Sequence, residues 1–133
     1  YFEGEIKASR SQRSFYLSAA RSYLFNLNLA DVVKNGTWHD NTVGGPLYGD
    51  QQEGVAPLSI TEKAHLEENP SLAKGIHKNR LKLERRSYSI VPASMCWARE
   101  GDMLSLSFDL PTGIFATSLL AEFLNFTVLL GEA

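Results

Sequence analysis

The strongest periodic pattern in the chain lies in residues 14–30, SFYLSAARSYLFNLNLA. Apolar side chains recur there at steps of three and four residues, as they do on one face of an α-helix. Ser11 or Ser14 could cap the first free N–H groups of this helix, and Asn35-Gly36 supplies a left-handed stop. The pattern therefore predicts one bounded helix whose apolar face carries Phe15, Ala19, Ala20, Tyr23, Leu24, Leu27 and Ala30.

Helical signals resume after residues 37–57, a stretch rich in Gly, Pro, Asn, Asp and Gln without a sustained period. Compact domains rarely carry so long an irregular segment, so it is either a functional loop or a place where residues are missing. Ser59 and Glu62 have capping-box spacing, and Asn69-Pro70 is typical of a helix that restarts. We therefore expect two short helices or one kinked helix, the second with one side formed by Leu72, Ile76, the stem of Arg80 and Leu83.

The period changes to two beyond Arg86. Tyr88 and Ile90 precede Pro92, and after the turn signal REGD at residues 99–102 the apolar positions alternate with polar ones up to Leu110. This pattern predicts two or three antiparallel strands. A closing amphipathic helix is indicated by Ala116, Leu119, Leu120, Phe123 and Leu124, so the fold class is α+β.

The composition is that of an ordinary globular protein, with 133 residues of which 44% are hydrophobic and 21% charged. One Cys and ten Gly exclude a disulfide scaffold and a collagen-like repeat. No apolar run reaches the roughly 18 residues of a membrane span, and the three His lack the spacing of metal ligands. We therefore expect a soluble cytoplasmic protein with no membrane contact and no metal.

Charge is unevenly distributed although the net charge is only −2. The charged residues between positions 40 and 68 are six acids and one Lys, whereas residues 74–86 contain a basic run. Together with arginines near the first helix, this run could contact nucleic-acid phosphates. A solvated helix face with ordinary ion pairs is the more frequent origin of such a run, and both interpretations stay open. The sequence contains no nucleophile elbow and no Gly-rich phosphate loop.

Two segments are more specific than these patterns require. The first is QRSFYLSAARSYLFN, residues 12–26, and the second is LPTGIFATS, residues 110–118, followed by EFLN at residues 122–125. In this order they resemble the C-terminal half of tRNA pseudouridine synthase D (TruD), whose hallmarks are an R-S-x-x-L-S-A-A-R-S-x-x-F-N helix and an L-P-x-G-x-F-A-T segment. The resemblance covers roughly residues 10–125, and Arg85-Arg86, Pro92 and Trp97 also fit it.

The resemblance implies a division into two parts. Residues 1–87 would be part of the insertion domain of that family, and residues 88–133 the C-terminal part of its pseudouridine synthase catalytic domain. A segment near residues 40–41 would be missing, because family members carry a P-G-D segment and a strand or two soon after the G-x-W that residues 36–38 resemble.

The resemblance also implies an activity on tRNA. The family isomerises a D-arm uridine, at position 13 of the tRNA, by flipping the base out of its stack, breaking its glycosidic bond and rejoining it through carbon 5. The partner would be tRNA, and the family needs no metal or organic cofactor. The oligomeric state is left open.

The site residues follow from matching positions. Phe115 occupies the phenylalanine of the L-P-x-G-x-F-A-T segment, which lines the base pocket, although packing under the closing helix is the alternative. Phe2 could be the remnant of a second pocket segment, N-Y-F-G. The candidate RNA contacts are Arg13, Arg21, Lys78, Arg80, Arg85 and Arg86.

Two departures limit the resemblance. The nucleophilic aspartate of the family lies in a G-x-K-D motif that this sequence lacks, so we assign no catalytic residue and expect the chain alone to be inactive. The arginine expected before Glu122 is Ala121. A noncatalytic RNA-binding module is therefore the main alternative, and a helical protein-interaction domain is a third.

Overall fold

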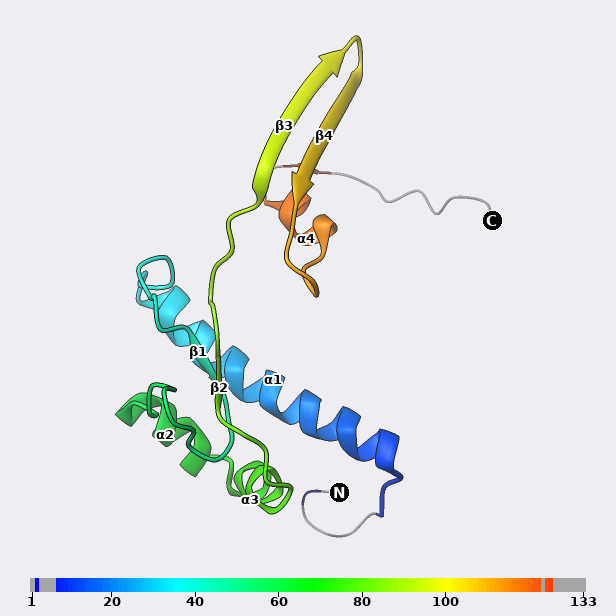
Figure 1. Cartoon of the computed structure of the whole chain (residues 1–133). Helices are drawn as coiled ribbons and strands as arrows, with labels where there is room; N and C mark the ends of the chain where they lie inside the picture. Colours follow the sequence, from blue (N-terminus) through cyan, green and yellow to red (C-terminus); the bar gives the residue numbers. More distant parts are fainter. Residues whose placement is uncertain (1, 3–6, 123, 126–133) are drawn as a thin grey trace. The chain divides into compact units, whose positions relative to one another are not determined.

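The computed structural model describes residues 2, 7–122 and 124–125, and it divides the chain into two compact units, Tyr1–Ser89 and Ile90–Ala133. Each unit has its own two-stranded antiparallel sheet, β1 with β2 in the first and β3 with β4 in the second (Figure 1). Helices and strands are mixed along the chain, which confirms the α+β class. Among the described residues, no helix has the length and apolar character needed to cross a membrane.

Helix α1, Arg10–Lys34, begins earlier than the apolar period indicates. Ser9 is its N-cap, because the Ser9 hydroxyl accepts from the Gln12 N–H (3.3 Å) and the Gln12 side chain accepts from the Ser9 N–H (2.9 Å). The expected caps Ser11 and Ser14 are therefore wrong: both lie within the helix, and the Ser9–Gln12 capping box fixes its start. The predicted stop is confirmed, since Asn35 is the C-cap and Gly36 follows with a φ of 70°.

The buried face of α1 differs from the expected one. Phe15 and Tyr23 are 71% and 50% exposed. Apolar side chains occupy more of the helix circumference than one face can bury, so the period alone did not decide which of them face the core. The buried residues are Leu17, Ala20, Leu24, Phe25 and Asn28.

Residues 37–57 are less irregular than expected. They contain β1, Gly45–Leu47, which pairs with β2, Glu84–Arg86, so that Gly45 lies opposite Arg86. Gly44 adopts a φ of 77°, and a Cβ there would overlap the backbone carbonyl of Arg86. A three-residue strand is too short to produce a recognisable period, which is why the sequence did not reveal it.

Helices α2, Ile60–Glu67, and α3, Pro70–Lys78, confirm the predicted interruption at Asn69-Pro70. The predicted capping box is also confirmed, since the Ser59 N–H donates to the Glu62 carboxylate (2.8 Å) and the Glu62 N–H donates to the Ser59 hydroxyl (3.2 Å). Helix α3 ends sooner than expected, and Arg80 then adopts a φ of 52°. Leu83 is buried, but it lies in the segment that leads into β2 and not on a helix face.

The core of the first unit is built from Leu24, Tyr48 and Ile76, with five partly buried leucines around them. Its polar atoms are paired: the Asn28 amide donates to the Tyr48 hydroxyl (2.8 Å), which donates to the Glu62 carbonyl (2.6 Å). Buried polar groups stabilise a fold when they are satisfied in this way. Tyr48 therefore anchors the loop after β1 against both α1 and α2.

Burial raises the pKa of Tyr48, and it raises the pKa of Tyr88 to about 12. The centre of the Tyr88 ring lies 5.3 Å from the centre of the Phe25 ring. The folded state favours the neutral phenols of these two tyrosines over the ionised ones. Their contribution to the free energy of unfolding is therefore complete below pH 10, the ordinary pKa of tyrosine, and is lost as the pH rises toward 12. We expect the free energy of unfolding, measured by urea titration, to fall across this range. Tyr88→Phe should flatten the fall, whereas the exposed control Tyr23→Phe should not; equal slopes in the two variants would contradict the prediction.

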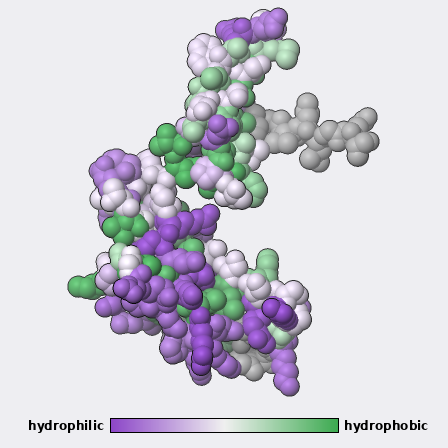
Figure 2. Space-filling model, viewed as in Figure 1, coloured by the Kyte–Doolittle hydropathy of each residue, from purple (hydrophilic) through white to green (hydrophobic). Residues whose placement is uncertain are grey.

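The second unit contains a hairpin of β3, Ala93–Glu100, and β4, Met103–Asp109, followed by α4, Ala116–Ala121. The hairpin and the closing helix confirm the predicted elements, but the first strand begins at Ala93 because Tyr88 belongs to the first unit. Phe123, expected in the closing helix, lies outside the described residues, and Leu124, also expected there, lies beyond the end of α4, so the helix is shorter than predicted. In the view of Figure 2, hydrophilic side chains cover much of the first unit, whereas hydrophobic ones are more frequent on the second.

Candidate functional site

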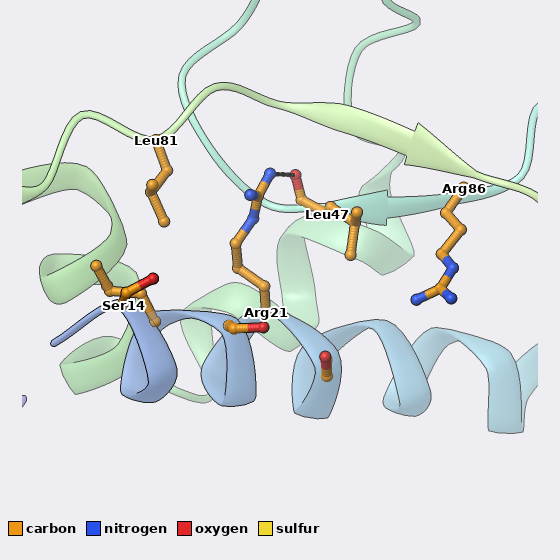
Figure 3. A pocket seen from close by; sticks show the side chains of 8 residues that line it. Ser14, Arg21, Leu47, Leu81 and Arg86 are labelled. Carbon is orange, nitrogen blue, oxygen red and sulfur yellow. Dashed lines mark hydrogen bonds between the residues drawn. The ribbon is translucent and has the colours of Figure 1, made fainter. Parts of the chain in front are cut away.

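A groove of about 280 Å³ lies in the first unit between α1 and the β1–β2 ribbon (Figure 3). One wall carries the serine hydroxyls of α1 at positions 14, 18 and 22, because every fourth residue of a helix returns to nearly the same face. The other wall comes from the strands and the segment before β2. The groove, called the serine groove below, is lined by Ser14, Leu17, Ser18, Arg21, Ser22, Leu47, Leu81 and Arg86.

Arg21 connects the two walls of the serine groove. Its Nη2 atom donates to the carbonyls of Leu47 (2.8 Å) and Lys82 (2.7 Å), and lies 3.5 Å from the Glu84 carboxylate. The Arg21 side chain is 16% exposed, and its Nε atom is buried without a hydrogen-bond partner in the described part of the chain. The guanidinium thus ties α1 to the segments on either side of it and keeps one unused donor.

Arg86 brings a second positive charge to the serine groove. Its guanidinium carbon lies 5.8 Å from the centre of the Phe25 ring, a distance at which the ring face attracts a cation. The side chain is exposed. The residues lining the groove therefore supply two cations and three hydroxyls but no carboxylate.

Arg85, the neighbour of Arg86, contacts other residues. Its Nη1 and Nη2 atoms donate to the two carboxylate oxygens of Glu62 (2.6 and 3.0 Å), and both side chains are 13% exposed. Further bonds run to the carbonyls of Gly44, Ala56 and Pro57. Successive side chains of a strand point to opposite faces, so one arginine of this pair is directed inward and the other toward the groove.

The remaining predicted RNA contacts do not line the groove. Arg13 is exposed near the start of α1, Lys78 is the last residue of α3, and Arg80 follows that helix; all three are exposed. The structure therefore brings together only Arg21 and Arg86 of the predicted set. Sequence reasoning missed the three serines, for which the four-residue spacing inside residues 12–26 was the available signal.

The two predicted pocket phenylalanines lie in different units. Phe115 is the N-cap residue of α4 and is 74% exposed, and Gly113 precedes it with a φ of 89°. Phe2 belongs to the first unit, where its ring lies so close to Gly75 of α3 that a Cβ at Gly75 would overlap it. Among the described residues, no group of three or more His, Cys, Asp and Glu side chains could hold a metal ion.

Comparison with known proteins identifies the class. No family model and no solved structure gives a match. A relative from Hydrogenovibrio crunogenus is 32% identical over 157 residues, covering 91% of this chain and 45% of the relative. A relative from Photobacterium profundum is 34% identical over 149 residues, covering 86% of this chain and 42% of the relative. The chain thus spans less than half the length of these relatives.

Both relatives are named tRNA pseudouridine synthase D, a name that places them among the pseudouridine synthases. The chain belongs to the tRNA pseudouridine synthase D family, which confirms the resemblance of its two motifs. The match extends over 157 residues of the first relative but uses only 91% of the 133 residues of this chain. In the matched region the relative therefore has over thirty residues that have no counterpart in this chain. The position of that difference near residues 40–41 stays a prediction.

Proposed function

We propose that this chain is part of a tRNA pseudouridine synthase that converts a D-arm uridine of tRNA, at position 13 in the family, into pseudouridine. The observation that carries the proposal is the 32–34% identity to relatives named for this activity over most of the chain. The reaction breaks the bond from the ribose to N1 of uracil and forms a bond to carbon 5. It leaves the atoms of the nucleotide unchanged in number, so it needs no net oxidant or reductant.

In this proposal the second unit receives the flipped base. The exposed Phe115 offers an aromatic face for stacking, which is the usual way in which proteins hold an unpaired base. The nucleophilic aspartate would come from a G-x-K-D motif outside this sequence, so the chain alone would be inactive. The division between Ser89 and Ile90 supports an insertion-domain part followed by a catalytic-domain part.

The first unit would hold the tRNA backbone. Arg13, Lys78, Arg80 and Arg86 are exposed and available for phosphates, and contacts of this kind weaken steeply as salt increases. Arg85 is held by internal partners, and we assign it to shaping the surface. Arg21 is also held by internal partners, but it lines the serine groove and contributes its charge there. A tRNA substrate also implies a cytoplasmic location.

Reconstitution from parts tests this function. This chain is mixed with the N-terminal part of the Hydrogenovibrio crunogenus relative, and tritium release is measured from tRNA labelled at carbon 5 of uridine, because the new bond displaces that hydrogen. We expect no release from either part alone and release from the mixture. The relative's own two parts serve as the positive control. Release by that control but not by a mixture containing this chain, while the chain still binds tRNA, would favour the noncatalytic RNA-binding module.

A further inference from the structure

We propose that the serine groove binds a backbone phosphate of RNA. The choice of RNA rests on the proposed function, whereas the anion-binding chemistry follows from the groove itself. A volume of about 280 Å³ is near the lower limit of small-molecule sites. It therefore suits a phosphate with adjoining ribose atoms better than a stacked base.

The serine hydroxyls provide the first part of the chemistry. Ser14, Ser18 and Ser22 are exposed on α1, and none of their hydroxyls has a hydrogen-bond partner within the residues that the structure describes. A serine hydroxyl donates one hydrogen bond, and phosphate oxygens only accept. Because positions 14 and 22 are about 12 Å apart along the helix, the row offers its donors to successive phosphates of a backbone and not to one anion.

The two arginines provide the second part. The Nε–H group of Arg21 is buried without a partner, which costs about 1–3 kcal/mol unless a ligand or water accepts from it. Arg86 is exposed at the same groove, with its guanidinium carbon 5.8 Å from the centre of the Phe25 ring. Guanidinium groups form strong charge-assisted bonds with phosphate, so an anion here would pair with the exposed Arg86 and lie close to the charge of Arg21.

The negative charge of Glu84 should weaken anion binding in the serine groove, and its removal provides a test of the phosphate site. Its carboxylate is 63% exposed and lies 3.5 Å from Nη2 of Arg21, where it partly neutralises the charge offered to a ligand. Removing this charge should tighten anion binding.

The test measures tRNA binding to the 133-residue chain by fluorescence anisotropy at about 50 and 200 mM salt. Ser18→Asp places a carboxylate in the groove and should raise Kd at least tenfold. The matched control is Ser105→Asp, the same substitution at an exposed position of β4, which should leave Kd within twofold. Glu84→Gln should lower Kd, and Arg86→Gln should raise it and reduce the salt dependence by about one phosphate contact.

The outcomes separate this proposal from the proposed function. Equal Kd values for Ser18→Asp and Ser105→Asp, in variants with unchanged circular dichroism, would overturn the phosphate site, as would no tRNA binding by the parent chain at low salt. If Ser18→Asp weakens binding but the reconstituted mixture releases no tritium, the phosphate site stands and the isomerase function fails. If the mixture releases tritium and Ser18→Asp changes neither tRNA binding nor the reaction rate, the isomerase function stands and the phosphate site fails.

Discussion

Replacing Arg85 with glutamine should lower the free energy of unfolding of the first unit by about 3–5 kcal/mol, because the change leaves the Glu62 carboxylate unpaired in a site that is 13% exposed. Total stabilities are commonly about 5–15 kcal/mol, so this loss would remove a large share of the fold's margin. Glu62 also completes the capping box of α2 and accepts, through its carbonyl, from Tyr48. The damage should therefore spread from β2 to α2 and the core.

Arg86→Gln is the matched control, since it makes the same chemical change one residue further along β2 at an exposed side chain. We expect it to change the free energy of unfolding by less than about 1 kcal/mol. Urea titration followed by helical circular dichroism reports on the first unit, which contains α1, α2 and α3. Equal losses in the two variants would contradict the assignment of Arg85 to the interior.

Phe115→Ala should lower the rate of uridine isomerisation by the reconstituted enzyme about 5- to 150-fold. Stacking of a base on an aromatic side chain contributes about 1–3 kcal/mol, and the exposed ring of Phe115 is the stacking surface that the proposal assigns to the flipped base. Phe115→Tyr keeps that surface and should retain most of the rate. Single-turnover tritium release from carbon 5 of uridine measures this step.

Phe15→Ala is the control for Phe115→Ala. Phe15 is 71% exposed and Phe115 is 74% exposed, so both changes remove a similarly exposed ring, one from α1 and the other from the N-cap of α4. We expect Phe15→Ala to leave the rate nearly unchanged. Equal rates for the two variants, at equal tRNA affinity, would remove Phe115 from the base pocket.

The features of the fold that could be predicted from the sequence are local ones. The Ser59–Glu62 capping box, the break at Asn69-Pro70 and the turn of the β3–β4 hairpin each depend on residues a few positions apart. The pairing of Gly45 with Arg86 depends on strands far apart in the sequence. Such pairing is decided by tertiary packing, and three-residue strands carry too little pattern to reveal it.

The candidate site shows the same limit. The basic run could be identified from composition, but its arginines have different environments: Arg85 is paired with Glu62, whereas Arg86 lines the serine groove. Which neighbour in a short strand faces inward depends on the surfaces on either side, and these come from α1 and α2. The serine row was visible in residues 12–26, but its opposite wall requires residues 47, 81 and 86.

Mapping pseudouridine in tRNA tests the central claim most directly. Transcribed tRNA is incubated with this chain and the N-terminal part of the Hydrogenovibrio crunogenus relative, treated with a carbodiimide that marks pseudouridine, and copied by reverse transcriptase. The account predicts one new stop, at the D-arm uridine, that requires both parts. No D-arm stop, when the relative's own parts produce one under the same conditions, would contradict it.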